Sequence, residues 1–130
     1  MAVKAASTPR DLGGNGRKLW RKLAQQVADD GLILDERELF LLHAACRETD
    51  MLARIEAALE GADMTVRGAQ GNWVAHPLLG EARRSRAQVA SLLKQIGLTD
   101  PHAGTATTGQ PMSVSEAGRK GGYARHGRGA

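Results

Sequence analysis

The stretch from Leu34 to Gly61, LDERELFLLHAACRETDMLARIEAALEG, decides the fold of this chain of 130 residues. Asp35 is a favourable N-cap residue, and Glu38 stands three positions later, where its side chain completes a capping box. Apolar residues then recur at helical spacing, and neither glycine nor proline interrupts them before Gly61. We therefore predict one long helix of about 26 residues, or roughly 39 Å. Such a length suits packing against a neighbouring subunit, although an antiparallel helix of the same subunit would also cover it.

A shorter amphipathic helix is predicted before the long one. Apolar residues recur at helical spacing over residues 19–27, after a lead-in rich in glycine, so we expect order to begin near Arg17. Residues 1–15 are expected to form a flexible N-terminal arm. Residues 16–98 then form the helical core, and residues 99–130, which are rich in glycine, alanine and threonine, are expected to form a disordered basic tail.

A small β-hairpin is predicted at about residues 63–76. Val66 and Trp73 favour strands, and the glycine-rich segment between them supplies the turn. Two strands alone are only marginally stable in water, so the hairpin must pack on a helix or on another subunit. Pro77 then suits the first turn of a third helix, and Gly97 suits its C-cap. The expected fold class is mainly α, with three helices and a hairpin before the last of them.

The net charge of +4 is unevenly distributed along the chain. Residues 1–22 carry six lysines and arginines against one acidic residue, residues 23–97 carry eight against eleven, and residues 98–130 carry four against two. Basic ends around an acidic middle are typical of a structural core whose arms bind nucleic acid or another polyanion. No apolar stretch is long enough to span a bilayer or resembles a signal peptide, so we expect a cytoplasmic protein.

No catalytic constellation or metal site emerges from the sequence. The four histidines lack metal-ligand spacing, and Cys46, the only cysteine, is better interpreted as a small core residue than as a nucleophile. The glycine-rich segments near Gly13 and Gly118 lack the phosphate-binding loop pattern, so no ATP site is predicted. His76 is expected to cap the third helix, with contact to a ligand as the alternative. We therefore expect no enzymatic activity, no cofactor and no metal.

Two groups of basic residues are candidates for DNA binding. The first group crowds the start of the first helix and consists of Arg17, Lys18, Arg21 and Lys22. Because cations there oppose the helix dipole, contact with DNA phosphates explains this group better than local stability does. The second group lies in the tail, where it offers either phosphate contacts or solubility, and consists of Arg119, Lys120, Arg125 and Arg128.

A third basic group lies early in the third helix and consists of Arg83, Arg84 and Arg86. We expect ion pairs, within or between subunits, between these arginines and acidic residues of the long helix, namely Glu48, Asp50, Glu56 and Glu60. Only four residues of the chain are aromatic, so one subunit has few bulky side chains to fill a core. We therefore expect the long helix, the third helix and the hairpin with Trp73 to contact neighbouring subunits.

Four short motifs follow one another within residues 13–98. They are GRKLWRKL from Gly16, LFLLHAAC from Leu39, TVRGAQG from Thr65 and HPLLGEAR from His76. In this order and spacing they resemble the small terminase subunits of tailed bacteriophages. The resemblance implies a ring-forming protomer that acts in the host cytoplasm and binds double-stranded viral DNA at the packaging start region. It also implies that the ring recruits and regulates the large terminase subunit, which holds the ATPase and nuclease.

The residues alone leave two other functions open. The first is a small transcription regulator in which residues 16–46 form a helix-turn-helix, although a third helix preceded by a hairpin does not resemble a recognition helix. The second is a non-enzymatic assembly protein whose basic tail binds an acidic partner. Retention of DNA at low salt separates DNA-binding functions from the second alternative.

Overall fold

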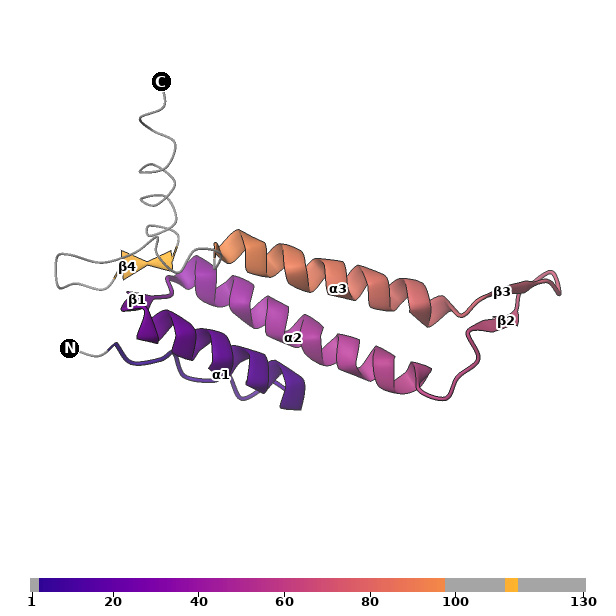
Figure 1. The fold of residues 1–130 in the computed structure, drawn as a ribbon, viewed down its shortest axis with the longest axis horizontal. Coiled ribbons are helices and arrows are strands. Elements are labelled where there is room, and N and C mark those ends of the chain that lie inside the picture. The colour runs from indigo at the N-terminus through magenta and orange to yellow at the C-terminus, as the bar shows by residue number, and fades with distance from the viewer. Residues whose placement is uncertain (1–2, 98–111, 115–130) are drawn as a thin grey trace, which may run out of the picture.

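The computed structural model of the protein describes residues 3–97 and 112–114 and contains three helices that lie side by side (Figure 1). Helix α1 spans Gly14–Asp29, α2 spans Glu36–Leu59 and α3 spans Pro77–Ile96. The middle helix, α2, packs on both of the others. The predicted fold class is therefore confirmed. In the part of the chain that the structure describes, no helix has the length and apolar character needed to cross a membrane.

The long helix α2 begins where the capping box places its start. The Asp35 carboxylate accepts a hydrogen bond from the Glu38 backbone N–H at 2.8 Å, and the Glu38 carboxylate accepts one from the Asp35 N–H at 3.0 Å. The helix is 24 residues long, close to its predicted length. Because α1 and α3 both lie along it, helices of the same subunit cover much of its surface.

The core fills the space between the three helices. Leu42 and Cys46 of α2 and Ile96 of α3 have no exposed surface, and Trp20 of α1 is 3% exposed. Burial, and secondarily the negative charge of Asp50, raises the pKa of the Cys46 thiol to about 12. At neutral pH this thiol is therefore protonated, which makes Cys46 a poor nucleophile.

Strands β2 (Thr65–Arg67) and β3 (Trp73–Ala75) form the predicted antiparallel hairpin, with Val66 opposite Val74. The hairpin extends beyond the neighbouring ends of α2 and α3 (Figure 1), and nearly all of its strand residues are exposed. Within one subunit the hairpin therefore buries little of its surface.

Both ends of α3 follow from local sequence. The His76 Nδ1 atom accepts a hydrogen bond from the Leu78 backbone N–H at 3.1 Å, which makes His76 the N-cap. Pro77 occupies the first turn, where its missing N–H leaves no hydrogen bond unmade. At the other end Gly97 adopts the left-handed conformation with φ of 82°, which glycine reaches without steric cost.

The segment before α1, residues 3–13, lies against α1 and α2, and we call it the strap (Figure 1). We expected a flexible arm over residues 1–15 and order from near Arg17. In the structure α1 begins at Gly14, and Leu12 of the strap lies in the core with 3% of its surface exposed. The burial of this apolar side chain attaches the strap to the helices.

A short parallel pairing joins β1 (Leu32–Ile33) to β4 (Met112–Ser113). The next residue, Val114, is 3% exposed and belongs to the core. Of the tail that is expected to be disordered, residues 99–130, the structure describes residues 112–114, among which Ser113 and Val114 are buried. The rest of that prediction lies outside the described residues.

Candidate nucleic-acid interface

The outer face of α1 carries the first basic group. Its members are all exposed and are Arg17, Lys18, Arg21 and Lys22. The opposite face of the helix is buried against the core and includes Gly16, Trp20, Ala24 and Val27. Because residues four positions apart lie one turn apart, the four cations share one continuous exposed side of the helix. No acidic residue lies in the first turn of α1.

A carboxylate from α2 occupies the N-terminus of α1. Asp50 accepts hydrogen bonds from the backbone N–H groups of Gly13 and Gly16, both at 2.7 Å. This carboxylate interacts favourably with the positive end of the helix dipole and satisfies amides that a phosphate would otherwise bind. A phosphate beside α1 must therefore be bound by the cationic side chains rather than by these amides.

Gly16 permits the close approach of α1 to α2. A Cβ atom at this position would overlap Asp50 Oδ2 and would lie 2.7 Å from the carbonyl oxygen of Cys46. At Gly14, by contrast, an added Cβ would have no atom within 4 Å. The glycine that opens the GRKLWRKL motif is therefore needed for the packing that positions the basic face.

The basic group borders two shallow hollows. Lys18 lines one of them together with Arg54 of α2, and Arg21 and Lys22 line the other, which lies between α1 and the strap. Arg54 is exposed and extends the positive surface from α1 onto α2. The role of Arg54 cannot be predicted from the sequence, because helical periodicity predicts its exposure but not which part of α1 lies beside it.

The last residues of the strap contact both α2 and α1. His43 Nε2 of α2 lies 2.9 Å from each carboxylate oxygen of Asp11. This hydrogen bond holds the pKa of the Asp11 carboxyl below its usual range, against a smaller opposing effect of desolvation. On the other side the Arg17 guanidinium donates a hydrogen bond to the Arg10 carbonyl oxygen at 3.4 Å. No pattern in the sequence predicts the contact between Asp11 of the strap and His43.

The arginines of α3 have different surroundings. Arg86 Nη2 lies 3.5 Å from Glu56 Oε1 of α2, which joins the two helices within one subunit. Arg84 pairs with Glu81, one turn earlier in α3. Among the described residues Arg83 forms no ion pair.

Two of the acidic residues expected beside these arginines bind other groups. Asp50 binds the backbone of α1, and Glu48 accepts a hydrogen bond from the hydroxyl of the buried Ser85 at 2.7 Å. The physical reason is that α2 meets α1 on one side and α3 on another, so its carboxylates divide between two neighbours. The charge of these carboxylates, without the arrangement of the helices, does not indicate which neighbour each one binds.

The hairpin presents large apolar side chains to solvent. Trp73 is 64% exposed, Met64 is 56% exposed and Val74 is 37% exposed. The Arg67 guanidinium stacks on the Trp73 ring, 4.7 Å from its centroid, and covers one part of it. These side chains form a surface suited to contact with another protein chain.

The remaining predicted site residues, Arg119, Lys120, Arg125 and Arg128, lie outside the described part of the chain. Across residues 3–97 and 112–114, no three His, Cys, Asp or Glu side chains are grouped so as to hold a metal ion. The candidate site on α1 therefore consists of cationic side chains, which bind anions such as the phosphates of nucleic acids.

Comparison with known families finds a match over most of the chain. The model of a family described as phage terminase, small subunit, matches residues 16–108. The matched segment contains α2, the hairpin, α3 and all of α1 except its first two residues. Searches among curated proteins and among solved structures found no match.

Proposed function

The chain belongs to the phage terminase small subunits, and from this premise we propose that it binds viral DNA at the packaging start region and recruits and regulates the large terminase subunit. A role in phage DNA packaging follows from the family itself. The proposed role is regulatory and non-enzymatic, and it is carried out in the cytoplasm of the host cell.

The basic face of α1, formed by Arg17, Lys18, Arg21 and Lys22, supports contact with DNA. Its four cations share one exposed side of the helix, and none of them forms an ion pair within the described residues. Only Arg17 of the four lies in the first turn of α1, so the helix dipole does not account for the cluster. Phosphates of double-stranded DNA would supply the missing negative charge. The tail cations would add affinity or contact the large subunit.

Salt dependence tests this proposal directly. If about six phosphates are neutralised per bound unit, the logarithm of the association constant should fall with the logarithm of salt concentration at a slope near −5. Fluorescence anisotropy with a labelled duplex between about 50 and 200 mM salt measures the slope. An affinity that does not change over this range would contradict binding through phosphates. A short operator-like footprint, unaffected by the large subunit, would instead favour a transcription regulator.

We propose further that the subunits close into a ring through α2, α3 and the hairpin. The exposed Trp73, Met64 and Val74 support this, because a hairpin with so little burial gains stability only when another chain covers it. Arg83, which forms no ion pair among the described residues, would then pair with an acidic residue of the next subunit. Each subunit would bind one neighbour through one surface and the other neighbour through a different surface. Such heterologous contacts can close into a ring.

Light scattering tests assembly. At micromolar concentration we expect a mass several times that of the 13.8 kDa chain. Trp73→Ala should shift the population towards monomer, because it removes the largest exposed apolar side chain of the hairpin, whereas Trp73→Phe should retain assembly. A wild-type species of 13.8 kDa would contradict the ring.

A further inference from the structure

We propose that the strap is part of the DNA-binding surface, where Lys4 and Arg10 contact phosphates beside α1 and the Asp11–His43 pair holds the strap in position. This inference rests on the proposed DNA binding and extends it to a segment that the basic cluster of α1 does not include.

The contacts between the strap and α1 place the strap backbone against the helix. Trp20 Nε1 donates a hydrogen bond to the Ala6 carbonyl oxygen at 3.2 Å, and the Arg17 guanidinium donates one to the Arg10 carbonyl oxygen at 3.4 Å. Both bonds use backbone atoms of the strap. The Arg10 side chain is exposed and has no partner among the described residues, so its charge is available beside that of Arg17.

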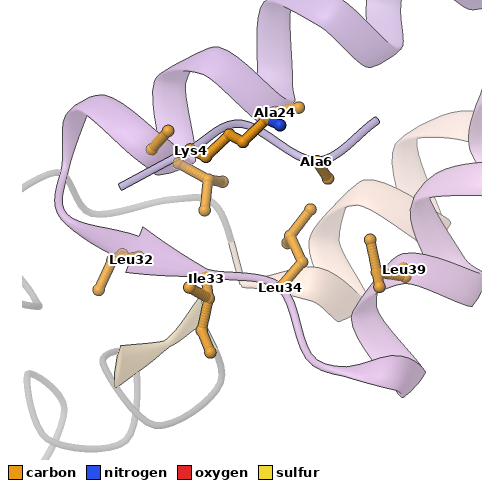
Figure 2. A pocket seen from close by; sticks show the side chains of 9 residues that line it. Lys4, Ala6, Ala24, Leu32, Ile33, Leu34 and Leu39 are labelled. Atoms are coloured by element: carbon orange, nitrogen blue, oxygen red, sulfur yellow. The ribbon is translucent and has the colours of Figure 1, made fainter. Parts of the chain in front are cut away.

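Lys4 lies at the other end of the strap. It lines a pocket with Ala24 and Val27 of α1, and in Figure 2 its side chain runs along α1 towards Ala24. The neighbouring strap residues line the hollow that also contains Arg21 and Lys22. The strap therefore runs beside the cations of α1, with Arg10 at the end near Arg17 and Lys4 at the end near Ala24, and one backbone of DNA could contact both segments.

The other side of the strap is attached to α2. Both oxygens of the Asp11 carboxylate lie 2.9 Å from His43 Nε2, and the adjacent Leu12 is buried in the core. The negative charge of Asp11 by itself opposes DNA binding, because it stands one residue from Arg10. Its contact with His43 gives it a positioning role that outweighs this repulsion.

Replacement of the Arg10 side chain tests the added phosphate contact. Because the hydrogen bond from Arg17 uses the Arg10 carbonyl, Arg10→Ala leaves the attachment of the strap intact. We expect duplex affinity to fall by about 3- to 10-fold and the salt slope to lose about 0.9, which is the value of one phosphate contact. Lys94→Ala removes an exposed cation from α3 and serves as the matched control. Equal affinities for Arg10→Ala and Lys94→Ala would overturn the contact.

Replacement of Asp11 tests the positioning role through the sign of its effect. On charge alone, loss of a carboxylate beside a basic surface strengthens DNA binding. If the carboxylate positions the strap, Asp11→Ala weakens binding, by about 3-fold or more, because Arg10 is no longer held beside Arg17. The control is Asp30→Ala, which removes an exposed carboxylate without a side-chain partner among the described residues and should bind DNA as tightly as wild type or more tightly.

The outcomes separate this inference from the proposed function. A wild-type protein that retains no duplex at low salt overturns DNA binding itself. A wild-type protein that binds, together with an Asp11→Ala variant that binds as tightly as Asp30→Ala, overturns the positioning role alone. Circular dichroism of each variant confirms that the helices are formed.

Discussion

We expect the quadruple alanine variant of Arg17, Lys18, Arg21 and Lys22 to bind duplex DNA about 4 × 10³-fold more weakly than wild type at about 0.1 M salt. Each phosphate contact adds about 0.9 to the salt slope, so four contacts account for about 3.6 of it. At about 0.1 M salt, each unit of this slope corresponds to a tenfold change in the association constant, so the loss of about 3.6 units gives the expected loss of affinity. The effect should shrink towards zero as salt approaches about 1 M.

The structure makes this variant mainly a test of charge, although it also removes the hydrogen bond from Arg17 to the Arg10 carbonyl oxygen of the strap, which the Lys18→Ala/Lys22→Ala pair leaves in place. All four side chains are exposed, none contributes to the buried face of α1, and alanine is a strong helix former, so the helix should be retained. Anisotropy measures the affinity, and light scattering on the same samples shows whether assembly is unchanged. The pairs Arg17→Ala/Arg21→Ala and Lys18→Ala/Lys22→Ala each remove half of the charge and report which side of the helix faces DNA. Wild-type affinity in the quadruple variant would remove α1 from the interface.

Gly16→Ala is expected to lower the free energy of unfolding by about 3 kcal/mol. The added Cβ would overlap Asp50 Oδ2 and would lie 2.7 Å from the Cys46 carbonyl oxygen. The Asp50 side chain could move, but only by giving up its hydrogen bonds to the Gly13 and Gly16 amides, and the Cys46 carbonyl is held within α2. We therefore expect α1 to be displaced from α2, with loss of packing around Trp20.

Gly14→Ala is the matched control, because it places the same methyl group two residues away in open space. Its stability should be unchanged or higher by up to about 1 kcal/mol, since alanine favours the helix more than glycine does. Urea unfolding should be measured at equal protomer concentration, because assembly adds to apparent stability. Equal destabilisation by the two substitutions would show that the contact between Gly16 and Asp50 does not carry the effect.

The ends of the helices and the hairpin could be predicted because their signals are local. Asp35 and Glu38 cap α2 by bonds between residues three apart, and Pro77 and Gly97 delimit α3 through their own backbone preferences. The exposed positions of the α1 cations likewise follow from helical periodicity. These features need no knowledge of what lies beside each helix.

The arrangement around the basic face could not be predicted in this way. Asp50 is 34 residues from Gly16, and His43 is 32 residues from Asp11, yet each pair is joined by a hydrogen bond. The carboxylate of Asp50 could pair with an arginine or cap a helix. Gly16, considered by itself, indicates only a turn or a helix end. The partner of each residue depends on where α1 crosses α2.

The sequence by itself thus determined the helices, the hairpin and the exposed cations of α1, because capping, periodicity and turn residues act over one or two turns of chain. Only the tertiary structure decided that the strap lies on α1, that Asp50 binds the N-terminus of α1, and that Arg54 and Arg10 lie near its cations. Those contacts form between segments that meet when α1 packs on α2, and the close fit at Gly16 selects that one arrangement.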